Sequence, residues 1–284
     1  MNKVFVWGMV LFIGGLTGVG IFFIILRAPS DKSDLVERFP INASEAIREN
    51  PMILIPAGEF IMGSEDGGAD EVPVRTVFLD AYKINQYEVT QHQYGEFVKA
   101  TGHRSPISRY VKNIHFFDHP NQPVVYVSWP DAYDYCRWRG QRLPTEAEWE
   151  KAARGQQGNT WPWVEDFKPA FANFKGERDK GVFTMTVGSY ETDQSPYRIY
   201  DMSGNVREWV QDWYDQDYYK HAPLKNPKGP KVGEVKVMRG SSWNDSHFSG
   251  RTTARLKMIP NYRETGVGFR CAETIDEVEI AEVG

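Results

Sequence analysis

The chain has 284 residues, of which 41% are apolar and 14% aromatic, enough for one sizeable globular domain with a hydrophobic core. Its formal net charge is -5, and no stripe of Lys and Arg side chains runs along it. Nucleic-acid binding is therefore not expected, because a phosphate backbone requires a basic surface.

The N-terminal segment is the most apolar part of the chain. Residues 4–26 (VFVWGMVLFIGGLTGVGIFFIIL) carry no charge and are long enough to cross a bilayer as a helix. Lys3 and Arg27 bracket the run, and neither a small-residue cleavage site nor a nearby cysteine indicates a signal peptide or a lipoprotein. We therefore expect residues 1–27 to form a transmembrane signal anchor, whose orientation the few flanking charges do not fix.

The next segments differ in composition. Residues 28–51 are polar, contain three prolines and show little apolar periodicity, so we interpret them as a tether between membrane and domain. The folded domain is expected over residues 52–273. Residues 274–284 are rich in acidic side chains and are interpreted as a solvated tail.

Three capping boxes predict three helices in the first half of the domain. In each, a hydroxyl side chain at the N-cap is followed three residues later by a Gln, Asp or Glu. The pairs are Thr90 with Gln93, Ser128 with Asp131, and Thr145 with Glu148. Apolar residues then recur at i, i+3 and i+4, and the helices are expected to stop near Gly102, at Gly140 and before Gly155.

Beyond Gly155 the chain is rich in Gly, Pro, Asn, Trp and Tyr, with short strand-like runs such as residues 235–238. Such a long irregular stretch in a compact domain requires stabilising contacts between residues far apart in sequence. Disulfides, metal ions and buried aromatic residues are the usual ones.

Six segments, in order, resemble the formylglycine-generating enzyme (sulfatase-modifying factor) family. They are IPAGEFIMGS (55–64), YEVTQHQY (87–94), PVVYVSWPDAYDYCRWRGQRLPTEAEWEKAARG (123–155), YDMSGNVREWVQDW (200–213), MRGSSWNDS (238–246) and GVGFRCA (266–272). The resemblance covers nearly everything after residue 52. It implies an α+β fold of the irregular C-type-lectin-like kind, and fold alone does not give function.

The resemblance also implies two structural calcium sites built from oxygen ligands, which suit this hard cation. The first would use the side chains of Asp201 and Glu208 and the carbonyls of Gly204 and Val206. The second would use the side chains of Asn173 and Asp179 and the carbonyls of Phe174 and Gly181. Two alternatives stay open: the 201–208 stretch also fits a Ser-Gly-Asn turn with a surface acid, and the second site has a shorter spacing than the family usually shows.

The chain contains two cysteines, Cys136 and Cys271. From the residues alone, two unpaired buried thiols are favoured over a bridge, because isolated buried thiols are common. The resemblance places a disulfide at these two positions. A disulfide requires an oxidising compartment, so we expect the domain outside the cytoplasm, on an inner or plasma membrane, and in the periplasm of a bacterium.

The catalytic feature of the family is missing. Formylglycine generation resembles copper-dependent oxygen chemistry run by two thiolates shortly after an R-G-G-S segment, because thiolates are the soft ligands that Cu(I) prefers. This chain has Asp245 and Gly250 at the corresponding spacing. Copper is therefore not expected as a cofactor, and the sequence identifies no catalytic residue.

Aromatic and charged residues nevertheless surround the position of the missing thiolates and form a candidate groove for a polar ligand. They are Arg239, Trp243, Asp245, His247, Arg251 and Arg255. The alternative is that Arg251 and Arg255 are structural ion-pair partners and that Trp243 belongs to the core.

Two functions follow. The leading interpretation is a non-catalytic binding or accessory module, held at the outer face of a membrane and docking a protein or peptide partner. The alternative is a protein- or metabolite-modifying oxidase or maturation enzyme of the same superfamily. A diversified ligand-display protein is disfavoured, because the segment after Trp243 lacks the Asn-dominated positions of such regions.

Overall fold

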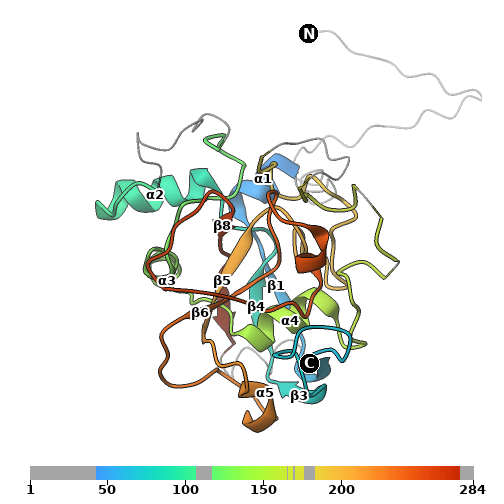
Figure 1. The fold of residues 1–284 in the computed structure, drawn as a ribbon. Coiled ribbons are helices and arrows are strands. Elements are labelled where there is room, and N and C mark those ends of the chain that lie inside the picture. Colours follow the sequence, from blue (N-terminus) through green and yellow to red (C-terminus); the bar gives the residue numbers. More distant parts are fainter. Residues whose placement is uncertain (1–42, 107–116, 165, 169, 176–182, 276–284) are drawn as a thin grey trace, which may run out of the picture. The chain divides into compact units, whose positions relative to one another are not determined.

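The computed structural model describes residues 43–106, 117–164, 166–168, 170–175 and 183–275 (Figure 1). The predicted membrane segment, the tether up to residue 42 and the tail from residue 276 lie outside these ranges. Within them, every helix is too short or too polar to span a bilayer. The membrane anchor thus stays a prediction.

The three predicted capping boxes are confirmed. They open α2 (Gln91–Thr101), α3 (Trp129–Trp138) and α4 (Glu146–Arg154). In each helix the N-cap hydroxyl accepts a hydrogen bond from the N3 backbone N–H, and the N3 side chain accepts one from the N-cap N–H. Helices α2 and α4 are capped by Gly102 and Gly155 at positive φ, whereas α3 ends two residues before Gly140.

Part of the predicted tether belongs to the folded domain. Helix α1 (Ala43–Glu49) lies there, and its Ile47 is buried against Tyr87 and Val187. The Asn50 side chain donates to the Tyr87 carbonyl at 3.1 Å and accepts from the Tyr87 N–H at 3.0 Å. The domain therefore includes residues before 52. Periodicity missed this because a seven-residue helix with one buried apolar side chain has too weak a pattern.

Short strands form three sheets (Figure 1). The first is antiparallel, in the order β1 (Met52–Ile55), β4 (Tyr82–Asn85), β9 (Ala272–Thr274). The second pairs β2 (Gly58–Met62) with β3 (Arg75–Leu79). The third has the order β7 (Leu256–Met258), β6 (Lys236–Arg239), β5 (Arg207–Trp213), β8 (Val267–Gly268), with β8 parallel to β5. Strand β6 matches the predicted run 235–238 within one residue.

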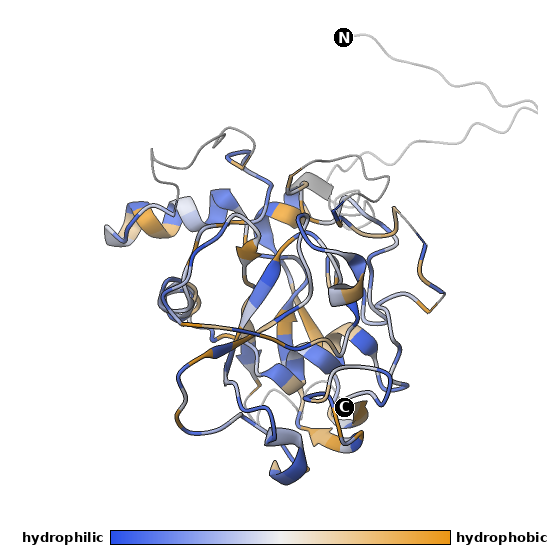
Figure 2. Ribbon diagram, viewed as in Figure 1, coloured by the Kyte–Doolittle hydropathy of each residue, from blue (hydrophilic) through white to orange (hydrophobic). Residues whose placement is uncertain are grey.

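The loops carry little further regular structure, as the composition predicted. They hold the short helix α5 (Tyr218–His221) and a 3-10 turn, η3 (His247–Gly250). In Figure 2, parts of the central strands and of α2 are coloured as hydrophobic, and many loops are coloured as hydrophilic. The mixed helix and sheet architecture agrees with the α+β expectation.

Cys136 of α3 and Cys271, which precedes β9, form a disulfide across 135 residues of sequence, with Cα atoms 5.7 Å apart. Both are fully buried in an apolar cluster with Tyr94, Trp209 and Phe269. The bridge ties the first half of the domain to its last strand. The disulfide implied by the resemblance is confirmed.

Reduction of this disulfide is expected to destabilise the domain by about 4 to 5 kcal/mol, because a long loop is released in the unfolded chain. Urea unfolding with and without reductant measures the loss. As a control, thiol labelling of denatured, unreduced protein should add no label, and reduced protein should take up one on each cysteine. Full labelling without reductant would show that the bridge is absent.

Candidate functional site

A buried ion pair lies at the start of β5. The guanidinium of Arg270 donates two hydrogen bonds of 2.7 Å to the two oxygens of Glu208, and the Trp149 indole N–H donates a third at 3.0 Å. All three side chains are fully buried. Arg270 thus compensates the charge of Glu208, which leaves this carboxylate poorly suited to the calcium-ligand role predicted for it.

The backbone of the predicted first calcium site faces two carboxyl groups that sequence reasoning missed. Glu88 accepts from the Val206 N–H at 3.2 Å, and Asp193 accepts from the Gly204 N–H at 3.0 Å. Both acids are buried. Neither lies in the 201–208 segment, so only the fold brings them there.

Asp201 is the third buried acid beside this pair, and it accepts from the Gly188 N–H at 2.6 Å. Burial raises the pKa of Asp201 to about 7, and it raises the pKa values of Glu88 and Asp193 well above the usual range. Arg270 supplies one positive charge against four carboxyl groups here. The excess negative charge must be neutralised by bound protons or by a cation.

The second predicted calcium site is described only in part. Asn173 is buried, and its amide nitrogen donates to the Phe183 carbonyl at 2.9 Å and to the Asn205 side-chain oxygen at 3.2 Å. Among the residues that the structure describes, its own side-chain oxygen has no hydrogen-bond partner. A buried oxygen of this kind fits a calcium ligand, because a cation would satisfy it. Asp179 and Gly181 lie outside the described residues, while Phe174 is buried beside Asn173.

Within the described ranges no group of three or more His, Cys, Asp or Glu side chains is arranged to hold a metal ion. The calcium sites therefore stay predictions. The unpartnered side-chain oxygen of Asn173 supports the second calcium site. The hydrogen bonds that Glu208 already accepts from Arg270 and Trp149 speak against the first site.

The three arginines of the candidate groove are engaged in ion pairs. Arg239 is fully buried and pairs with Glu146 at 3.0 Å and Glu150 at 2.7 Å. Arg255 pairs with the same Glu146 at 2.7 Å. These guanidinium groups join α4 to β6 and to the residue that precedes β7. For Arg255 this agrees with the alternative of a structural ion pair.

Arg251 likewise makes two hydrogen bonds to Glu71, at 2.7 and 2.9 Å. All three arginines thus have carboxylate partners, which favours a structural role over a ligand-binding one, and the groove stays a prediction. Their carboxylate partners lie 89 to 180 residues away in sequence, so no local sequence pattern predicted these ion pairs.

The remaining groove residues do form a surface. Trp243 is partly exposed, with ring centroids 5.7 Å from Phe117 and 5.2 Å from Phe183, and its indole N–H donates to the Thr265 carbonyl at 3.0 Å. We call these three rings, together with the adjoining Arg207, Asp245 and Glu264, the Trp243 surface. His247 stacks on Phe167 at 4.1 Å in a neighbouring aromatic cluster.

Arg207 organises the polar half of the Trp243 surface. It pairs with Asp245 through one nitrogen and with Glu264 through another, at 3.0 Å. Asp245 also accepts from the Ser242 hydroxyl at 2.7 Å, and Tyr262 donates to Glu264 at 2.8 Å. The Asp245 carboxylate is therefore held in place by the Arg207 guanidinium and by the Ser242 hydroxyl and backbone N–H.

The position of the second missing thiolate has no room for a side chain. A Cβ atom on Gly250 would lie 2.6 Å from the Phe174 ring and 2.8 Å from the Ser203 hydroxyl oxygen, well inside normal contact. The Ser203 hydroxyl also donates to the Gly250 carbonyl at 2.6 Å. Phe174 thus fills the space that a cysteine would need.

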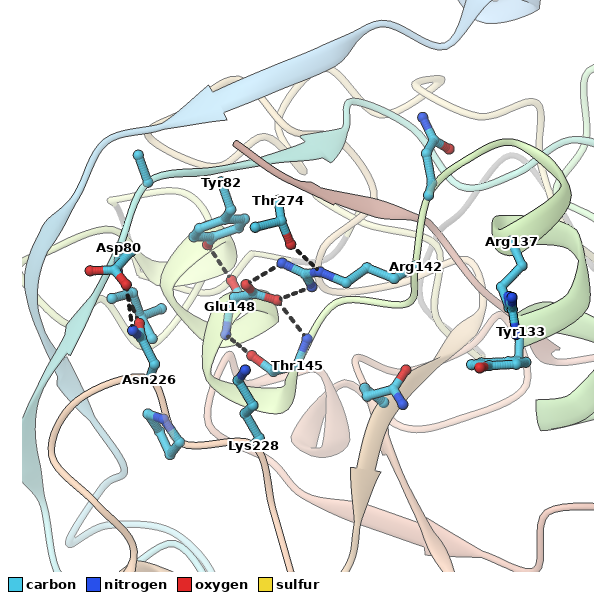
Figure 3. Close-up of a pocket in the computed structure, with 15 residues that line it drawn as sticks. Asp80, Tyr82, Tyr133, Arg137, Arg142, Thr145, Glu148, Asn226, Lys228 and Thr274 are labelled. Carbon is cyan, nitrogen blue, oxygen red and sulfur yellow. Dashed lines mark hydrogen bonds and ion pairs between the residues drawn. The ribbon is translucent and has the colours of Figure 1, made fainter. Parts of the chain in front are cut away.

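A separate pocket of about 490 Å³ lies between α3, the start of α4 and β3 (Figure 3). Its lining residues, all described, include none of the predicted site residues. We call it the Tyr133 pocket. It is lined by Leu79, Asp80, Ala81, Tyr82, Tyr133, Arg137, Gln141, Arg142, Thr145, Glu148, Gln211, Asn226, Pro227, Lys228 and Thr274.

The buried acids predict a pH dependence of stability. Because the pKa of Asp201 is raised from 3.8 to about 7, the folded state binds more protons than the unfolded state between these values, and stability falls as pH rises through this window. Asp201→Asn cannot ionise and tolerates the positive φ of 59° at this position.

In chelator, the free energy of unfolding of Asp201→Asn should therefore fall less steeply from pH 4 to pH 7 than that of the wild type. Urea unfolding at a series of pH values measures both slopes. Asp66→Asn, at an exposed acid, serves as the matched control. Identical slopes for wild type and Asp201→Asn would contradict the assignment.

Comparison with known proteins identifies the family. Residues 39–275 match the sulfatase-modifying factor enzyme 1-like domain. The formylglycine-generating enzyme of Streptomyces coelicolor is 33% identical, over 79% of this chain and 89% of that protein. The serine/threonine-protein kinase pkn1 of Chlamydia pneumoniae is 35% identical over 82% of this chain but only 40% of its own length.

Among solved structures, PvdO from Pseudomonas aeruginosa superposes with a TM-score of 0.69 and 29% identity, covering 79% of this chain and 94% of that one. The fold of the described residues agrees with this solved structure. This chain therefore belongs to the sulfatase-modifying factor, or formylglycine-generating enzyme, domain family.

Proposed function

We propose that the domain is a non-catalytic binding or accessory module that docks a protein or peptide at the Trp243 surface. One observation carries the proposal. Both cysteines of the chain are joined in a disulfide, and the two thiolate positions hold Asp245, which pairs with Arg207, and Gly250, whose side-chain space Phe174 fills. Thiolate-ligated copper does not fit this site.

The Trp243 surface has the composition of a docking site. Partly exposed aromatic rings and arginine are enriched among the residues that dominate binding energy at interfaces. Trp243, Phe183 and Arg207 combine both kinds in one place, and all three are only partly buried. The kinase relative supports an accessory role, since this domain type accounts for only part of that longer protein.

Anchoring completes the proposal. Residues 4–26 would hold the domain at an inner or plasma membrane, and the disulfide favours the oxidising side of it, the periplasm in a bacterium. Calcium, bound in part through the Asn173 oxygen, would stabilise the loop-rich half.

The alternative is a protein- or metabolite-modifying enzyme, which the formylglycine-generating relative favours. Such an enzyme would have to use groups other than thiolates. Glu264, about one third exposed and hydrogen-bonded to Tyr262, is the group at the Trp243 surface that could transfer a proton.

A turnover assay separates the two functions. Full-length protein, supplied with copper and a reductant, should bind a sulfatase-type cysteine peptide and return it unchanged in mass. Trp243→Ala should weaken that binding about tenfold, since aromatic anchors are worth more than 1 kcal/mol. Trp138→Ala, at an exposed tryptophan outside this surface, is the control.

Mass spectrometry would reveal conversion as loss of the cysteine sulfur. Its appearance in the wild type, and its disappearance in Asp245→Ala or His247→Ala, would establish an enzyme with a new ligand set and overturn the proposal.

A further inference from the structure

The Tyr133 pocket is built from distant segments. Its walls come from the turn between β3 and β4, from α3, from the start of α4 and from the loop that contains Asn226 and Lys228. Figure 3 shows Arg137 beside Tyr133 on one side and Lys228 on another, with the Arg142 and Glu148 pair between them. The Arg142–Glu148 ion pair thus forms part of the pocket wall, and the cationic side chains of Arg137 and Lys228 lie around it.

The acids of the pocket are already compensated. Glu148 accepts two hydrogen bonds of 2.7 Å from Arg142 and one of 2.8 Å from the Thr145 N–H. Asp80 accepts from the Asn226 amide at 2.6 Å and pairs with Lys225 at 3.3 Å. The charge of each carboxylate is therefore neutralised by a cation of this chain.

Two further cations line the pocket, and one of them, Lys228, helps to lower the pKa of Asp80. Arg137 and Lys228 are exposed, and neither makes an ion pair with any residue that the structure describes. Arg137 lies 5.7 Å over the Tyr133 ring, which leaves its charge available. On a chain with a net charge of -5, this pocket is a local positive site that attracts anions.

Its lining also limits the kind of anion. Leu79, Ala81, Pro227 and the Tyr133 ring supply apolar contacts, and Gln141 and Gln211 supply amide groups. A small inorganic anion would use none of the apolar area, whereas a peptide that mixes carboxylates with aliphatic side chains would use both.

We propose that the Tyr133 pocket binds an acidic peptide segment of a partner protein, recognised by Arg137 and Lys228. This site is independent of the Trp243 surface, so either can fail without the other. Residues 276–284 of this chain (DEVEIAEVG) have the same composition and follow soon after Thr274, a lining residue. They are therefore the competing occupant that the test must separate.

Fluorescence anisotropy with a labelled DEVEIAEVG peptide tests the proposal. The full-length chain should bind it. Arg137→Gln and Lys228→Gln should each weaken binding about threefold and together about tenfold, the scale of exposed charge pairs. Raising the salt concentration should weaken it further. Lys231→Gln, at an exposed lysine outside the lining, should change nothing.

A second peptide, NQVQIAQVG, should not bind, because it keeps the aliphatic residues and lacks the charges. A chain that ends at Ile275 should bind DEVEIAEVG with the same affinity as the full-length chain. Much tighter binding after truncation would assign the pocket to this chain's own acidic segment and overturn the proposal that a partner protein occupies it. Absence of binding, or binding that both substitutions leave unchanged, would overturn the site itself.

Discussion

The buried pair of Arg270 and Glu208 is the interaction on which the rest of the domain depends. Besides its two bonds to Glu208, Arg270 donates to the backbone carbonyls of Asn85, Gln86 and Tyr200. One side chain thereby joins β4, β5 and the turn before residue 201, and the next residue enters the disulfide. Loss of either partner would leave a buried charge without compensation, at a cost of about 3 to 5 kcal/mol.

This constraint also positions the Trp243 surface. Neighbouring residues in a strand point to opposite faces, so fixing Glu208 inward turns the adjoining Arg207 toward Asp245 and Glu264. The scaffold is that of the family. An ion pair and a phenylalanine ring occupy the places where thiolates would stand.

Sequence reasoning succeeded where the determining contacts are local or where a resemblance supplied them. Capping boxes involve residues three apart, so all three helix starts were predictable. The disulfide came from the resemblance and not from the residues alone. The ion pairs of Arg239 and Arg255 join residues 89 to 109 apart, and the buried acids Glu88 and Asp193 converge only in the fold. The Tyr133 pocket, assembled from several segments, gave no local signal.

We propose that this member of the family has no thiolate site for copper and binds its ligand without oxidising it. Titration of Cu(I) in competition with a chromogenic chelator tests this most directly, with a formylglycine-generating relative as positive control. The account predicts that the native, disulfide-bonded protein withdraws no Cu(I) from the chelator. Withdrawal of one equivalent, abolished in Asp245→Ala, would contradict it.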